Sequence, residues 1–144
     1  MAEKDFEAIE TDITQALMEA AQWRLNREVR ELEVIRKGKK VFSFRVQGLD
    51  EDVWDRCRRN NTRNRGKRNE ELDNMRYVSQ LIYEATIDED KYIWQNRELW
   101  KKFNVATSAD FIWYILTPEE KADFGRVLET LSCFNSEAED IIKN

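Results

Sequence analysis

A run of basic residues is the part of this sequence best suited to chemistry with a partner. Of the thirteen residues from Arg56 to Arg68, seven are Arg or Lys and none is acidic. We call residues 56–68 the basic segment, whose positive side chains are Arg56, Arg58, Arg59, Arg63, Arg65, Lys67 and Arg68. The basic segment carries a charge of +7, so the rest of the chain must carry −12 to give the overall −5.

Three interpretations of the basic segment remain open. It could be a solvated flexible loop, or an electrostatic handle for an acidic protein partner. Arg and Asn side chains also suit phosphates and base edges, which would make the segment a nucleic-acid site. Nucleic acid is the least favoured partner, because the whole chain is acidic and no aromatic residue interleaves the arginines as in single-strand binders.

A second candidate surface comes from a dense group of aromatic residues in the C-terminal third. Core packing accounts for most of them, but Trp and Tyr also dominate the hot spots of protein interfaces. Trp113 and Tyr114 follow an apolar pair, Phe111-Ile112, so at least one of the two aromatic rings should point outward from a helix. We therefore expect partner binding through the basic side chains together with Trp94, Trp100, Trp113 and Tyr114.

Residues for catalysis or for metal binding are scarce. The chain has no histidine, which removes the commonest general base and the commonest metal ligand, and its four glycines form no phosphate-binding fingerprint. Asp88-Glu89-Asp90 lacks the ligand ladder and the glycine of a calcium loop. Cys57 has no base nearby in sequence and is interpreted as a small core residue. We expect no enzyme activity, no cofactor and no metal site.

Composition favours one helical domain in a reducing compartment. At 144 residues the chain is near the common domain size, and four Gly and one Pro are few for a turn-rich β fold. Cys57 and Cys133 do not make a disulfide framework. The acidic N-terminus is unlike a signal peptide, and no apolar run approaches the roughly 20 residues that span a bilayer. The expected compartment is a reducing cytosol, with no insertion into a membrane.

Hydrophobic periodicity predicts a mainly α, compact helical domain with one small β-hairpin and an N-terminal amphipathic helix. Residues 1–30 form an acidic helical arm, which either docks on the domain or lays its apolar stripe on a partner. Residues 31–135 form the domain, with a hairpin that turns at Gly38. Residues 136–144 form a tail or a short helix. The apolar stripe of the arm is Phe6, Ile9, Ile13, Leu17 and Ala20.

Capping residues set the expected ends of the helices inside the domain. Asp50 is a predicted N-cap for a helix that ends near Asn60-Asn61, and apolar spacing predicts a second helix from Glu70 to Ala85. A short helix is expected between Tyr92 and Phe103. Thr107 and Thr117 are each expected to cap a further helix, the second with Pro118 at the first helical position and Glu120 at the third.

Several short motifs, in a consistent order over about residues 32 to 135, resemble the XkdN-like phage tail assembly chaperone family. A hairpin strand, the step Gly48-Leu49-Asp50-Glu51, a helix with a Cys-Arg-Arg run and a basic loop come first. Two departures stand out: Asn104 replaces a usual glycine, and Thr117-Pro118 replaces a Pro-Gly step. The other matching motifs are Val41-Phe42-Ser43-Phe44-Arg45-Val46, Glu71-Leu72-Asp73 with Tyr77, Glu84-Ala85-Thr86, Glu98-Leu99, Phe103-Asn104-Val105, Ile115-Leu116-Thr117-Pro118-Glu119-Glu120 and Ala122-Asp123-Phe124.

This resemblance implies a factor that works in the host cytoplasm and is absent from the finished virion. Its implied partners are the tape measure protein, which it would keep soluble, and tail tube subunits, which it would help to recruit. Self-association is left open. Two alternatives also stay open: a nucleic-acid-associated regulator that acts through the basic segment, and a structural component of the tail.

Overall fold

The computed structural model describes residues 12–22 and 27–132. Residues 1–11 of the predicted arm and the predicted tail 136–144 lie outside the described residues. The fold is mainly α with a small β-hairpin, as the sequence predicts. After a helix over residues 12–22, the elements are β1 (Val29–Arg36), β2 (Lys39–Gln47), α2 (Glu51–Asn60), β3 (Thr62–Arg63), β4 (Glu71–Leu72), α3 (Asn74–Ala85), the 3-10 helix η1 (Asp88–Trp94), α4 (Arg97–Phe103), α5 (Ser108–Ile115) and α6 (Pro118–Leu131).

Strands β1 and β2 form the predicted hairpin. They pair antiparallel with Leu32 opposite Phe44, and the turn places both Lys37 and Gly38 at positive φ, 53° and 73°. Two positive φ values suit the right-handed twist of a tight hairpin, and the second falls on glycine, which adopts it without strain. One face of the hairpin is buried and carries Leu32, Val34, Phe44 and Val46.

The buried face of the hairpin packs on a cluster of aromatic rings. The Trp94 ring lies edge-on to Phe44, with 5.0 Å between ring centroids, and Phe44 meets Phe124 of α6 at 5.6 Å. The indole N–H of Trp94 donates a hydrogen bond of 3.0 Å to the Thr86 hydroxyl. Edge-to-face ring contacts and a hydrogen-bonded indole N–H both have a preferred geometry. Together they fix the position of the hairpin on the helices.

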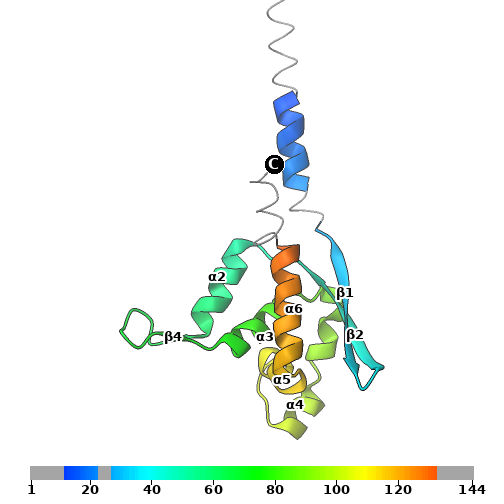
Figure 1. The fold of residues 1–144 in the computed structure, drawn as a ribbon, viewed down its shortest axis with the longest axis vertical. Coiled ribbons are helices and arrows are strands. Elements are labelled where there is room, and N and C mark those ends of the chain that lie inside the picture. The colour runs from blue at the N-terminus through cyan, green and yellow to red at the C-terminus, as the bar shows by residue number, and fades with distance from the viewer. Residues whose placement is uncertain (1–11, 23–26, 133–144) are drawn as a thin grey trace, which may run out of the picture.

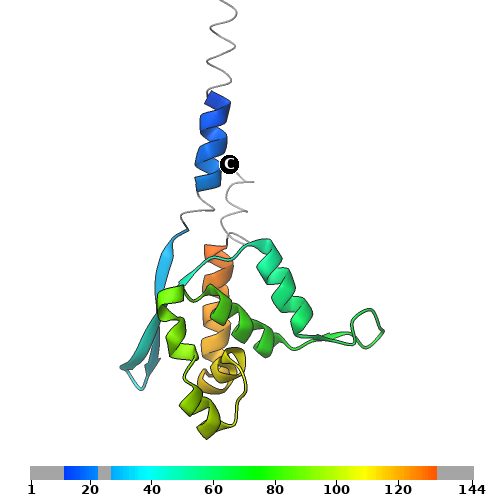
Figure 2. The ribbon, with the colours of Figure 1, turned by 180° about the vertical axis from the view of Figure 1, so that it is seen from behind.

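The helices surround α3, which contacts α2, α5 and α6. In Figures 1 and 2 the hairpin lies on one side of α6 and α2 lies on the other, while the helix over 12–22 projects beyond the body. The C-terminal end of β2 is held in place as well: Val46 forms a bridge with Thr86, and the amide of Ile87 donates to the Arg45 carbonyl at 3.0 Å.

Most predicted helix ends are confirmed. Thr117 and Glu120 form a reciprocal capping box with Pro118 at the start of α6, and the Thr107 hydroxyl accepts from the Asp110 amide. Asn104 ends α4 in the left-handed conformation, with φ 57° and ψ 48°. Asn tolerates that conformation better than most residues, so it can take the place of a glycine here.

The predicted helix start at Glu70 was wrong. Helix α3 begins at Asn74, because the Asp73 side chain accepts the Arg76 amide and caps it there. The two residues before Asp73, Glu71 and Leu72, instead pair with Thr62-Arg63 as a second two-stranded sheet. Strand pairing between β3 and β4 thus takes the place of the first helical turn that the apolar spacing predicts.

Candidate functional site

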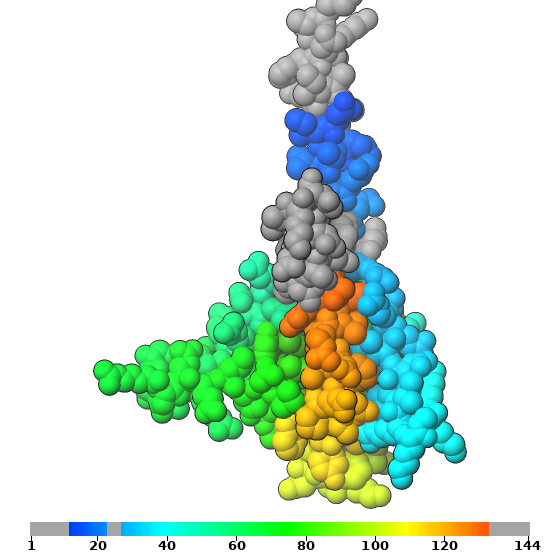
Figure 3. All heavy atoms as spheres, viewed as in Figure 1, coloured from blue at the N-terminus to red at the C-terminus, as the bar shows by residue number. Residues whose placement is uncertain are grey.

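The basic segment begins in the second half of α2 and continues through β3 and into the turn that leads to β4. In Figure 3 this part of the chain, drawn in green, projects from the body as a narrow arm. Asn64 and Gly66 in the turn have positive φ, 55° and 76°, and both are residue types that accept it. The segment therefore comprises the second half of a helix, a two-residue strand and part of a turn.

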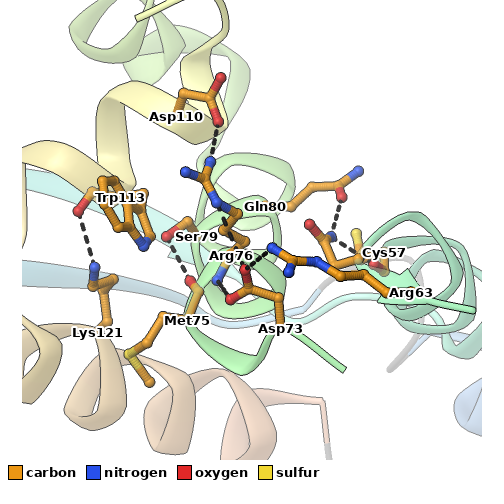
Figure 4. Close-up of polar contacts among 11 residues, drawn as sticks. Cys57, Arg63, Asp73, Met75, Arg76, Ser79, Gln80, Asp110, Trp113 and Lys121 are labelled. Atoms are coloured by element: carbon orange, nitrogen blue, oxygen red, sulfur yellow. Dashed lines mark hydrogen bonds and ion pairs between the residues drawn. The ribbon is translucent and has the colours of Figure 1, made fainter. Parts of the chain in front are cut away.

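Polar contacts hold the base of the basic segment against α3 (Figure 4). The Asn61 amide group donates to the Gln80 side chain at 2.8 Å and to the Cys57 carbonyl at 2.7 Å. The Asp73 backbone amide donates to the Asn61 carbonyl at 2.9 Å, and Arg63 lies 3.7 Å from the Asp73 carboxylate. The direction in which the segment leaves the body is thus set by hydrogen bonds at its base.

Most charges of the basic segment lack an acidic partner among the described residues. Arg56 pairs with Glu84 at 3.2 Å and Arg63 with Asp73 at 3.7 Å. The other five side chains are exposed and form no ion pair within the part of the chain that the structure describes; they are Arg58, Arg59, Arg65, Lys67 and Arg68. Three of these charges lie on the projecting turn and two lie in the last turn of α2, and together they create a positive potential that attracts an acidic partner.

Trp113 of α5 lies between two cations beside this base (Figure 4). The Arg76 guanidinium is 4.6 Å from the ring centroid and also pairs with Asp110 at 2.6 Å. The Lys121 ammonium is 5.2 Å from the same ring and donates to the Trp113 carbonyl at 2.9 Å. Burial, and to a lesser extent the positive charge of the nearby Arg76, lowers the pKa of Lys121. These contacts orient the ring, whose residue remains 39% exposed.

Arg76 connects Trp113 to the basic segment. Its guanidinium, stacked on Trp113, lies 3.7 Å from the carboxylate of Asp73, to which Arg63 is also paired. Sequence reasoning missed Asp73, Arg76 and Lys121 as part of this surface. The Asp73 cap three residues before Arg76 is a signal that could have located the first two, but nothing in the sequence places Lys121 against a ring of another helix.

Two hollows flank the base of the basic segment. One, with a volume of 350 Å³, is lined by Arg63, Leu72, Asp73 and Met75 together with two polar neighbours. The other, of 540 Å³, is lined by Asn61, Trp100 and Asp110 among others. Both offer apolar surface next to charged groups, which suits side chains of an amphipathic partner.

The four aromatic residues predicted to bind a partner fall into three environments. Trp94 is fully buried, so its assignment to a binding surface was wrong: it packs under the hairpin. Trp100 is half-buried and donates its indole N–H to the Trp94 carbonyl at 3.0 Å. Trp113 and Tyr114 are both exposed, and Tyr114 stacks on Phe103 with 4.9 Å between centroids. Only Trp113 joins the contacts at the base of the basic segment.

Cys57 is a free, buried cysteine. Burial raises the pKa of the Cys57 thiol to about 11, so the thiol stays protonated near neutral pH and is a poor nucleophile. Within residues 12–22 and 27–132, no three side chains of His, Cys, Asp or Glu gather into a group that could hold a metal ion. None of the described helices has both the length and the apolar character that a membrane crossing requires.

Comparison with known proteins identifies a family. Residues 14–144 match the sequence model of a family described as phage XkdN-like tail assembly chaperone protein. A solved structure, the crystal structure of the protein YqbN, is similar at 19% identity and a TM-score of 0.47, over 76% of this chain and 90% of that one. A search of curated proteins finds no match. Because the family match covers nearly the whole sequence, the chain belongs to the XkdN-like phage tail assembly chaperone family.

Proposed function

We propose that the chain binds the tape measure protein of its phage, keeps that protein soluble and helps to recruit tail tube subunits to it. By this proposal the client is a long helical protein that has to be kept soluble. A chaperone for such a client needs a surface that accepts amphipathic helix without a catalytic step. The proposed place of action is the host cytoplasm, and the finished virion would lack the protein.

One observation carries the proposal: the basic segment and the exposed face of Trp113 meet through Arg76 at one site. Unpaired arginines steer an acidic segment toward the surface, and the aromatic ring with the adjacent hollows buries apolar side chains once it arrives. We infer that the bound elements of the client are helices with an acidic flank and an apolar face.

Co-expression with the tape measure protein from the same phage genome tests this function. The wild-type chain should co-purify with the client and raise its soluble yield. The double variant R58E/R59E and the variant W113A should each lose most of this capture. The matched control is K101E/K102E, which makes the same change of charge on exposed lysines of α4, outside the basic segment.

The proposal fails if the wild-type chain neither co-purifies with the client nor changes its solubility, or if R58E/R59E captures it as well as K101E/K102E does. Tail tube recruitment is tested by adding the tube subunit to the purified complex. Detection of the chain in purified phage particles would contradict the proposed absence from the virion and favour a structural component of the tail.

A further inference from the structure

The helix over residues 12–22 presents an apolar face that nothing in the described structure covers. Every residue of this helix is exposed, including Ile13 at 57%, Leu17 at 66% and Met18 at 58%. Ile13 and Leu17 are one turn apart and lie on the same face, with Met18 beside them. Large apolar side chains grouped on an exposed helix are typical of an interaction surface.

The same part of the chain is strongly acidic. Residues 1–22 contain six Asp or Glu and a single lysine, for a side-chain charge of −5. Within the described helix, Asp12 and Glu19 are seven residues apart, so they share one face, which is turned roughly 130° from the stripe of Ile13 and Leu17. An acidic face and an apolar stripe on one helix complement the positive charge of the basic segment and the apolar wall of the hollow at its base.

Every copy of this chain therefore carries both an acidic helix and a basic segment, which are complementary in charge. The acidic helix projects from one end of the body, whereas the basic segment projects sideways beyond α2, as Figures 1 and 2 both show. Five positive side chains of the segment have no acidic partner among the described residues, and a hollow with Leu72 and Met75 in its wall lies at its base.

We propose that the acidic helix of one copy docks on the basic segment of a second copy. Asp12 and Glu19 face the arginines of the segment, and Ile13 and Leu17 cover the apolar wall of the hollow at its base. Charge steers the encounter and apolar burial holds it. This self-association goes beyond the proposed chaperone function and does not depend on it, since the tape measure protein takes no part.

Sedimentation velocity of the full chain alone, over about a hundredfold range of concentration, measures this association directly. The wild-type chain should associate as concentration rises, and high salt should weaken the association because salt screens exposed charges. R58E/R59E and D12K/E19K should each weaken it by about tenfold or more. A chain that carries all four substitutions should recover much of the lost affinity, because the exchanged charges of the helix and of the basic segment again attract each other.

Control variants separate docking from general effects of charge and hydrophobicity. K101E/K102E should associate like the wild-type chain. I13S/L17S should associate as weakly as the charge variants, whereas V41S, which removes an exposed apolar residue of the hairpin, should have no effect. Circular dichroism of every variant checks that the domain remains folded.

Three results would overturn the proposal: a monomer at all concentrations, association that R58E/R59E does not weaken, or failure of the combined variant to recover any affinity. A monomer in which the helix and the basic segment can be cross-linked within one chain also overturns it. Capture of the tape measure protein is a separate measurement, and D12K/E19K should still capture that protein. Failure of the self-association proposal can therefore be told apart from failure of the proposed chaperone function.

Discussion

Arg45 and Asp90 join the hairpin to η1 through three hydrogen bonds. The Asp90 carboxylate accepts from the Arg45 backbone amide at 2.8 Å and from its guanidinium at 3.0 and 2.8 Å. The carboxylate is mostly buried, whereas the Arg45 side chain is half exposed. Loss of the carboxylate therefore leaves the Arg45 backbone amide without its partner, while water can still reach the guanidinium. This pair fixes the second strand against the chain that follows α3.

Substitution D90N should lower the free energy of unfolding by about 1 to 3 kcal/mol, because an amide in place of the carboxylate turns a donor toward the guanidinium. Chemical denaturation measures the change. The control D123N removes an exposed carboxylate that is paired with Arg126 within α6, and should cost less than about 1 kcal/mol. Equal losses in the two variants would show that the Arg45 pair adds no more than a surface ion pair.

The Asp90 carboxylate should also make the free energy of unfolding depend on pH in acid. Hydrogen bonds from the Arg45 side chain, more than any other cause, hold the pKa of Asp90 below its ordinary value of 3.8. The stabilisation from Asp90 is therefore fully present above pH ~4 and is lost as pH falls through the lowered pKa of the folded state. The difference in unfolding free energy between wild type and D90N should stay constant above pH ~4 and narrow below it. A difference that widens in acid would contradict this assignment.

Gly48 allows the chain after β2 to pass directly against the end of α6. A Cβ atom at this position would lie 2.4 Å from the Leu131 carbonyl oxygen, a distance at which the backbone must move. G48A should lower the free energy of unfolding by more than about 1 kcal/mol. In contrast, G125A inside α6 meets only Val78 side-chain atoms, the nearest at 3.4 Å, and should be neutral or stabilising by up to about 1 kcal/mol. Thermal unfolding of both variants compares them.

Elements governed by neighbouring residues were predictable from the sequence. The capping box of Thr117 and Glu120 needs only residues three apart, and the turn at Gly38 needs only a local positive φ. The candidate site depends on contacts across the chain, such as Arg76 with Trp113 and Lys121 with the Trp113 carbonyl. Residue spacing shows which face of a helix a side chain occupies, but it does not show which residue of another helix that side chain contacts.

Trp94 illustrates why an aromatic residue can be placed wrongly from sequence. It lies at the end of a 3-10 helix, which has about three residues per turn, so α-helical spacing does not describe the face that it occupies. Strands β3 and β4 were missed for a related reason: each has two residues, too few for an alternating pattern. The basic segment was visible as charge, but its projection from the body was not.

The same substitution at two tryptophans should distinguish the core from the surface. W94F removes a buried indole N–H that bonds to Thr86 and leaves a void, so it should cost about 1 to 3 kcal/mol of unfolding free energy. W113F should cost less than about 1 kcal/mol, since that ring is partly exposed. Denaturant titration measures both, and a larger loss in W113F would contradict the assignment of Trp94 to the core and Trp113 to the surface.

Alkaline pH should destabilise the fold through Cys57. Burial raises the pKa of this thiol from 9.0 to about 11. Between these values the unfolded chain loses the thiol proton while the folded chain retains it, so the free energy of unfolding falls as pH rises. C57A lacks this titration, and its own fall over the same pH range should be smaller than that of the wild type. Because Cys133 is present in both proteins, it cancels in the comparison. Parallel pH profiles of the two proteins would show that the Cys57 thiol ionises as readily in the folded chain as in the unfolded one.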